Sequence, residues 1–467
     1  MGVMSGTRLL ERLSAADHYS LLGDDSGCPW DIGVVAVAEG AGLLDGNGRL
    51  RIDAVRGRVE RRLHLVPRFR QVLYRPSWGL GWPVWADAQR FNVADHVRVV
   101  PLPAPAGEAQ LLAACEQLRG QRLDPARPLW QLWLLPGLPG QRVGLFVRMH
   151  HAIADGIAGV AALGALLDLA ADAPTPAAPP WTPAPMPAAA ELFRDNMRWR
   201  LQGLDRTLSH LAHPVSTAHQ LRSDWPAWRE VFAEERAPRT SLNRPVGADR
   251  KLALVRSGLD LAKQIAHAHD AKVNDVVLTA VAEGLRELLR SRGESVEGLA
   301  LRAMVPVSLH QEQPGQERGN LDGMIVVPLP VGEPDPVRLL HLVAAETAER
   351  KNKAHPQAMS TGIFRFTAAR RAVVRLSSRQ RRFTLLVTNV PGPPVPLYLA
   401  GAPLLEVFPV VPLVGNQTLN VAVLSYAGQL NLTAVADGDA CPDVDVFAQG
   451  VRSALDKLAQ PAVTAAC

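Results

Sequence analysis

Cysteine is scarce in this chain of 467 residues: there are four, they lie far apart, and no two form a Cys-x-x-Cys pair. A zinc ribbon and a disulfide-stapled scaffold both need closely spaced or paired cysteines, so the sequence argues against both classes. The scarcity fits a reducing compartment and predicts a cytoplasmic protein. The N-terminal residues also lack a basic stretch followed by an apolar core, so we expect no secretory signal.

Long apolar runs are missing as well. The longest run extends from Ile157 to Leu167 and is rich in Ala and Gly. A helix needs about 20 apolar residues to cross a bilayer, so this run is too short. We therefore expect a protein that is soluble or that binds a membrane peripherally.

Lysine is rare, and arginine dominates the formal net charge of +5. This charge is modest for the length, and nucleic-acid binders usually concentrate basic and aromatic residues on one face, so we expect no nucleic-acid partner. The densest basic stretch extends from Arg365 to Arg382 and reads as a basic amphipathic helix. It fits either a solvated face of a packed helix or a surface that contacts a membrane or an anionic ligand, such as an acyl-carrier phosphate.

The chain divides into two α/β halves around a proline-rich segment. Seven prolines lie between Ala173 and Ala190, which predicts an extended linker there. We expect an N-terminal domain over residues 1–172, a linker with a crossover helix over 173–240, and a C-terminal domain over 241–467. Expected strands are 32–37, 91–100, 129–135, 143–149, 252–255, 301–306, 324–329, 383–388, 419–425 and 430–435; expected helices are 9–22, 52–65, 110–118, 157–169, 191–211, 259–268 and 273–289. This alternation predicts two mixed-sheet domains with a site between them.

The most informative segment follows the apolar run 143–149. His150 and His151 come directly after that run, and Asp155 and Gly156 follow shortly after them. A hydroxyl that attacks an acyl group must lose its proton in the transition state, and histidine, with an ordinary pKa of about 6.5, suits that task. His151 is the stronger candidate base because Asp155 follows at the spacing of one helical turn. Asp155 could orient the imidazole or pair with an arginine, and Gly156 permits a tight backbone turn.

Other interpretations of the segment stay open. A polar turn with a structural role explains the same residues. A metal site needs three or four ligands, and neither a His-Glu-x-x-His motif nor a cysteine cluster supplies the missing ones. No Gly-x-Ser-x-Gly elbow is present, so a serine hydrolase is also a poor explanation.

The segment resembles the His-His-x-x-x-Asp-Gly signature of bacterial wax ester synthase/diacylglycerol acyltransferases, a family within the chloramphenicol acetyltransferase-like acyltransferases. The short signature fits that whole superfamily, but further blocks narrow the resemblance. They occur in the family's order over nearly the whole chain: Leu13-Ser14-Ala15-Ala16-Asp17, Val66-Pro67-Arg68-Phe69-Arg70, Pro128-Leu129-Trp130, Asn274-Asp275-Val276-Val277-Leu278, Arg318-Gly319-Asn320 with Gly323-Met324 and Pro328-Leu329-Pro330, and Thr388-Asn389-Val390-Pro391-Gly392-Pro393. One departure is the polar stretch after Asp17, which leaves the acceptor undetermined.

The resemblance implies two chloramphenicol acetyltransferase-like α/β domains with an active-site channel at their interface. His151 would be the general base, with His150 beside it and Asp155 in a mainly structural role. Asn274 would orient the acceptor or stabilise the oxyanion, although from sequence alone Asn274-Asp275 also fits a helix N-cap. Further residues expected near the substrate are Gly156, Asn389, Pro128 and Trp130.

The implied reaction is O-acyl transfer from acyl-CoA to diacylglycerol, giving triacylglycerol, or to a long-chain alcohol, giving a wax ester. Acyl-CoA would be a co-substrate, and we expect neither a bound cofactor nor a metal. Lipid substrates predict peripheral contact with a membrane or lipid droplet, for which the basic segment around Arg370 to Arg382 is a candidate. The alternatives are a carrier-dependent acyltransferase acting on a polyketide or other secondary metabolite, and a non-catalytic lipid-binding relative.

Overall fold

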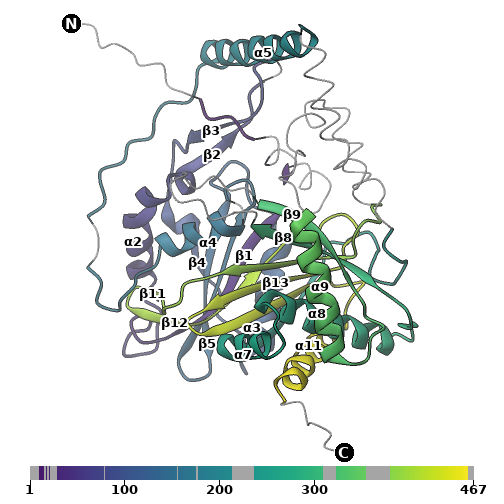
Figure 1. Cartoon of the computed structure of the whole chain (residues 1–467). Helices are drawn as coiled ribbons and strands as arrows, with labels where there is room; N and C mark the ends of the chain where they lie inside the picture. The colour runs from purple at the N-terminus through teal and green to yellow at the C-terminus, as the bar shows by residue number, and fades with distance from the viewer. Residues whose placement is uncertain are drawn as a thin grey trace, which may run out of the picture.

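Two mixed β-sheets form the framework of the computed structural model (Figure 1). The structure describes residues 10–14, 17, 20–21, 29–77, 79–154, 156–174, 177–212, 236–308, 322–353 and 379–460. In the first sheet the strand order is β11 (Tyr398–Leu399), β12 (Ala402–Val410), β1 (Asp31–Glu39), β6 (Arg142–His150), β5 (Trp130–Leu138) and β4 (Val97–Val99). In the second it is β7 (Arg250–Gly258), β14 (Gln429–Asp437), β13 (Leu419–Tyr426), β10 (Leu385–Pro391), β8 (Leu301–Ser308) and β9 (Asp322–Leu329).

Both sheets combine parallel and antiparallel pairs. β4 and β5 are parallel in the first sheet, and β10 is parallel to both β13 and β8 in the second. A separate hairpin joins β2 (Gln71–Tyr74) and β3 (Val84–Asp87). The expected class of α/β protein with mixed sheets is therefore confirmed.

Helices cover the sheets and fill the space between them. The helices are α2 (Ile52–Arg62), α3 (Glu108–Gly120), α4 (Gly156–Ala165), α5 (Ala189–Ala212), α7 (Leu259–Ala268), α8 (Val273–Ser291), α9 (Pro336–Lys353) and α11 (Val444–Ala459). The largest apolar core joins α7, α8, α9 and α11 to the second sheet. Another core places Leu111 and Cys115 of α3 with Phe146 of β6, Leu254 of β7 and Phe408 of β12. Through α3, one continuous apolar layer connects the two sheets.

The first sheet contains two strands from the C-terminal part of the chain. β12 runs antiparallel to β1, with Val35 opposite Phe408, although it lies inside the predicted unit 241–467. The sequence pattern does not predict this strand, because the prolines at 403 and 409 are unusual inside a strand. The two sheets therefore do not correspond to the N-terminal and C-terminal parts of the chain.

The expected strand over 91–100 is largely wrong. Val93–Asp95 form a 3-10 turn, and only Val97–Val99 pair as β4. Asn92 precedes the turn and accepts a hydrogen bond from the backbone of Ala94 at 3.0 Å. This local side-chain contact offers the backbone an alternative to a sheet ladder.

The described part of the proline-rich segment, 177–188, has no helix or strand, as expected for an extended linker. It is nevertheless docked on the first half. Arg70 lies over the ring of Trp181 at 4.6 Å, and Asp87 accepts a 3.0 Å hydrogen bond from the backbone of Ala184. The segment leads to α5, the outermost helix at the top of Figure 1.

Most of the basic stretch 365–382 lies outside the described residues, including Arg370, Arg371 and Arg375. Residues 379–382 are described and are not helical, and Arg381 donates a 3.0 Å hydrogen bond to the carbonyl of Ala237. In the described part of the chain, no helix is long and apolar enough to cross a membrane.

Candidate active site

The two histidines lie at the end of β6, the strand between β1 and β5 in the first sheet. Both faces of β6 are buried from Val143 to His150, which explains its nearly continuous apolar sequence. The backbone of His150 donates to Leu129 O at 2.9 Å, and that of His151 donates to Trp30 O at 2.8 Å. The neighbouring segments therefore fix the point at which the strand turns toward α4.

The two histidines differ in environment. His150 is buried, and its Nδ1 accepts a 3.0 Å hydrogen bond from the backbone N–H of Ala152. This contact requires an unprotonated Nδ1, so it fixes the tautomer and holds the turn. His151 is half-buried, and its ring meets the edge of Trp30, with ring centroids 5.9 Å apart. The geometry therefore assigns His150 to the turn and leaves His151 the more exposed of the two histidines.

A buried ion pair supports the strand end. Asp31 of β1 is the register partner of His150, and its carboxylate lies 3.4 Å from Nη1 of Arg148. Arg148 also donates to Gln131 Oε1 at 3.0 Å and lies over the ring of Trp133 at 5.2 Å. Burial lowers the pKa of Arg148, and the charge of Asp31 opposes that shift. This pair is not among the expected site residues, although an arginine inside a buried apolar strand is a signal that could have indicated it.

Asp155 lies outside the described residues. Gly156 begins α4, one turn after the histidines. Pro128 is buried just before β5, and its carbonyl accepts from the backbone of Trp130 at 2.9 Å. Trp130 is fully buried: its indole stacks between Phe69 and His96, and its N–H donates to Phe69 O at 2.8 Å. These contacts give Trp130 a packing role in the core, and its predicted contact with a substrate gains no support.

Asn274 and Asn389 come together in the second half. Asn274 is the second residue of α8, and its Oδ1 accepts from Nδ2 of Asn389 in β10 at 3.5 Å. The N-cap is Lys272, whose backbone N–H donates to Asp275 at 2.9 Å. Of the Asn274-Asp275 pair expected as a possible N-cap, Asp275 therefore makes a capping bond, and Asn274 is not the N-cap residue. Burial raises the pKa of Asp275, and the bond from Lys272 opposes the shift.

Gly392 allows β10 and β13 to approach each other at the end of the motif 388–393. A Cβ at this position would lie 2.2 Å from the carbonyl oxygen of Ser425, which no side chain tolerates. The backbone N–H of Gly392 donates to the Ser425 hydroxyl at 3.2 Å. The glycine therefore sets the position of the strand that carries Asn389.

One apolar cluster connects the histidine turn to the second sheet. It contains Met149, the residue before the histidines, together with Leu424 and Tyr426 of β13, and Ile153 and Val390 pack against it. Val390 is the next residue after Asn389. The histidine turn and the asparagine strand thus contact the same core from the two sheets. Among the described residues, no three His, Cys, Asp or Glu side chains gather in a way that could hold a metal ion.

Comparison with known families agrees with this arrangement. The wax ester synthase/diacylglycerol acyltransferase catalytic domain matches residues 13–277, and the C-terminal domain of the same family matches residues 318–459. This chain belongs to that acyltransferase family. The resemblance inferred from the motif blocks is confirmed.

Relatives with an assigned name cover nearly the whole chain. Two proteins of Mycobacterium tuberculosis named as diacylglycerol O-acyltransferases are similar to it. One is 30% identical over 91% of this chain and 90% of its own length. The other is 29% identical over 98% of this chain and 91% of its own length.

Solved structures establish the fold. The wax ester synthase/diacylglycerol acyltransferase from Marinobacter aquaeolei VT8 has a TM-score of 0.68 and 22% identity, and the match covers 96% of this chain and 98% of that one. The first condensation domain of the calcium-dependent antibiotic synthetase has a TM-score of 0.59 and 16% identity, with 98% of each chain covered. These likenesses confirm the predicted chloramphenicol acetyltransferase-like fold of this acyltransferase.

Proposed function

We propose that this acyltransferase transfers a fatty acyl group from acyl-CoA to the hydroxyl of a diacylglycerol or a long-chain alcohol, with His151 as the general base. The observation that carries the proposal is the difference in burial and hydrogen bonding between the two histidines. His150 is buried and bonded into the turn, whereas His151 is half-buried at the end of the central strand. The family and the names of the relatives support the substrate class.

In the proposed reaction the acceptor oxygen attacks the thioester carbonyl directly. His151 takes the hydroxyl proton as the new C–O bond forms. The tetrahedral intermediate then collapses, the C–S bond breaks, and the proton passes to the departing thiolate. No covalent acyl-enzyme is required, and a site closed to water would prevent hydrolysis of the thioester.

Asn274 is the proposed stabiliser of the oxyanion. Because its Oδ1 accepts from Asn389, its Nδ2 would be the atom that donates to the oxyanion. Asn274 also lies in the first turn of α8, where the backbone dipoles favour negative charge. A preorganised donor of this kind contributes about 3–4 kcal/mol to transition-state stabilisation.

The test combines one substitution with a competition between acceptors. Purified protein is incubated with labelled acyl-CoA and a mixture of diacylglycerol, long-chain alcohol and short polar alcohols, and the labelled products are resolved. His151→Ala should lower turnover by about 10²–10⁴-fold while the thermal transition is retained. Near-normal ester synthesis by this variant would overturn the mechanism. Labelled product only from other acceptors would overturn the substrate class, and lipid binding without any transfer would indicate a non-catalytic relative.

A further inference from the structure

Helix α5 exposes an unusual concentration of apolar side chains. Of the eight most exposed large hydrophobic residues in the described part of the chain, four lie on this helix between residues 193 and 201. Phe193, Met197 and Leu201 are 51%, 39% and 57% exposed. Residues four apart are about 40° apart around a helix, so these three side chains form one stripe.

The opposite face of α5 is anchored to the first half. Leu192 and Asn196 are buried, and the side chain of Asn196 donates to Gly79 O at 2.8 Å. Arg12 forms an ion pair with Asp195 and donates to Leu192 O at 3.1 Å. The helix is thus held with its apolar stripe turned outward, which explains why the stripe is not part of the core.

Arginines border the stripe. In helical projection Arg194 lies next to Leu201 on one edge and Arg200 next to Phe193 on the other, and both arginines are exposed. Asp195 points inward to Arg12, so it does not offset their charge at the surface. An apolar stripe between cations suits an interface in which acyl chains lie below anionic headgroups.

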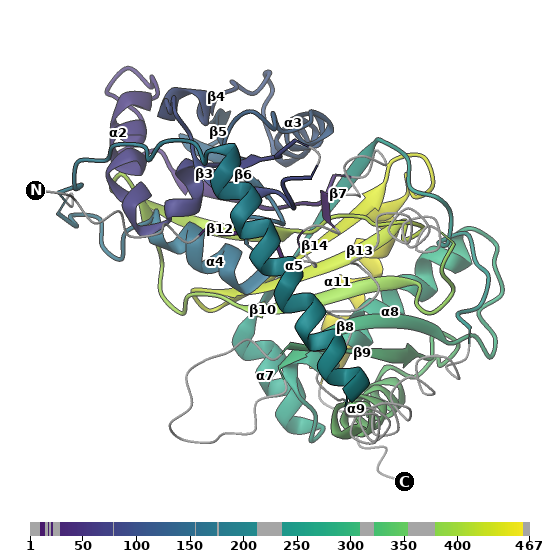
Figure 2. The same ribbon diagram turned by 90° about the horizontal axis from the view of Figure 1, so that it is seen from above.

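The anchor of α5 also contacts the region of the histidine turn. Arg12 donates to the carbonyl of Trp82 at 2.7 Å, and the next residue, Leu13, packs in a small cluster with Trp85, Ala152 and Ile153. Ala152 directly follows His151. In Figure 2, α5 lies in front of both halves of the molecule. The helix that carries the stripe is therefore linked through Arg12 and Leu13 to the residues beside the candidate base.

We propose that α5 docks the enzyme on an anionic lipid surface, with Phe193, Met197 and Leu201 inserted among the acyl chains and Arg194 and Arg200 at the phosphates. This docking would hold the protein where apolar substrates are concentrated. The binding itself does not depend on the reaction, whereas its role in substrate supply rests on the proposed function.

The test measures cosedimentation of the full chain with phosphatidylcholine vesicles that contain or lack phosphatidylglycerol. The triple variant Phe193→Gln, Met197→Gln, Leu201→Gln should bind anionic vesicles at least about tenfold more weakly than the wild type. A matched control replaces three similarly exposed apolar residues on separate elements, Leu65→Gln, Leu342→Gln and Val395→Gln, and should bind like the wild type. Arg194→Gln with Arg200→Gln should remove the preference for anionic vesicles.

Equal binding by the α5 triple variant and the wild type would overturn the proposal, as would a wild type that binds neither vesicle. Light scattering adds a further outcome: if the triple variant only converts a dimer to a monomer, the stripe is an interface between copies, and lipid docking is wrong. Should the triple variant fail to fold, Phe193→Gln and Leu201→Gln are measured singly. Activity on a water-soluble alcohol should be unchanged in all α5 variants, and activity on vesicle-embedded diacylglycerol should fall. Loss of vesicle binding with intact transfer separates this proposal from the catalytic one.

Discussion

The imidazole Nδ1 of His150 accepts a 3.0 Å hydrogen bond from the backbone N–H of Ala152, two residues later. The bond closes the turn that positions His151. The two adjacent histidines of the motif therefore have different structural surroundings, and substituting each one separately tests its role.

His150→Ala should lower the free energy of unfolding by about 1–3 kcal/mol, because it leaves the buried N–H of Ala152 without this acceptor. His150→Asn offers a carbonyl oxygen at a similar distance and should recover part of that loss. Thermal or denaturant unfolding measures both. Equal stability of the Ala and Asn variants would contradict a role for the acceptor.

Asn389→Ala should lower turnover through Asn274, because it removes the donor to Asn274 Oδ1. Since Asn389 would position the amide, the effect should appear mainly in kcat and be smaller than that of Asn274→Ala, which we expect to cost about 10²–10³-fold. Asn389→Gln or Asn389→Ser, which keep a donor, should recover activity partly. A change confined to stability, with normal kcat for Asn274→Ala, would leave both residues with a structural role only.

Asp275→Asn should change how stability depends on pH. Burial raises the folded-state pKa of Asp275, so between its unfolded and folded pKa values the folded protein binds more protons than the unfolded chain. The wild type therefore loses stability as pH rises through that window, whereas an amide does not titrate. Relative to the wild type, the Asn variant should gain in melting temperature as pH rises above the unfolded-state pKa of about 4. A stability difference independent of pH would contradict the assignment.

Gly392→Ala should destabilise the protein by about 1–3 kcal/mol, because the new methyl group meets the Ser425 backbone 2.2 Å away. Activity should fall as well, since the displaced strand carries Asn389. Gly57→Ala in α2 is the matched control: its Cβ would meet nothing within 4 Å, and helix propensity predicts a gain of about 0.5–1 kcal/mol. Equal melting temperatures for the two variants would show that β10 and β13 can separate without cost.

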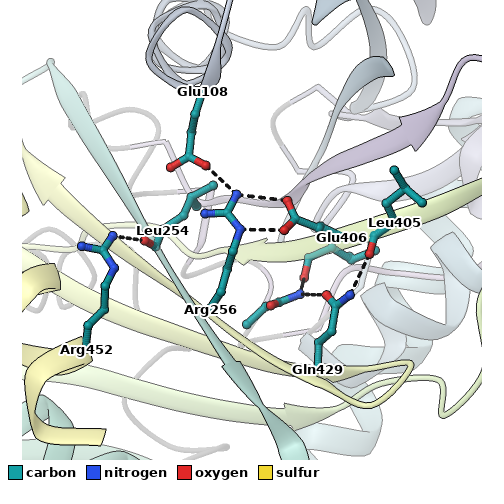
Figure 3. A network of polar contacts seen from close by, with 9 residues as sticks. Glu108, Leu254, Arg256, Leu405, Glu406, Gln429 and Arg452 are labelled. Carbon is teal, nitrogen blue, oxygen red and sulfur yellow. Dashed lines mark hydrogen bonds and ion pairs between the residues drawn. The ribbon is translucent and has the colours of Figure 1, made fainter. Parts of the chain in front are cut away.

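Arg256 connects three elements of the two halves (Figure 3). From β7 it donates to Glu406 of β12 at 2.6 and 3.0 Å and to Glu108 of α3 at 2.5 Å. These contacts, led by the hydrogen bond to Glu406, raise the pKa of Arg256. Because the Arg256 side chain is 41% exposed, solvent screens the pair, and a double-mutant cycle of Arg256→Gln with Glu406→Gln should give a coupling of about 0.5–1.5 kcal/mol. The coupling should shrink at high salt, and a value near zero would mean that this ion pair does not help to hold the halves together.

Local patterns in the sequence were sufficient for most elements and for the family. The helix α7 (Leu259–Ala268) coincides with its predicted range, and α8 begins at the predicted Val273, because apolar periodicity and helix start signals act within one turn of the chain. The ordered motif blocks likewise identified the acyltransferase family before any contact was known.

The tertiary structure determines which strands pair and which of these motifs lie close together. No local rule indicates that β12, with its two prolines, leaves the second half of the chain to pair with β1, because pairing depends on partners such as Val35 and Phe408, which are 373 positions apart (408 − 35). The same holds for the ion pair of Asp31 and Arg148, the contact of Asn389 with Asn274, and the outward stripe of α5. The sequence by itself determined that the histidine motif and the second-half Asn-Asp motif belong to one family of acyltransferases. Only the packing of the two sheets around a shared core decided that His150 is buried while His151 is half-buried, because burial depends on segments far apart in the chain.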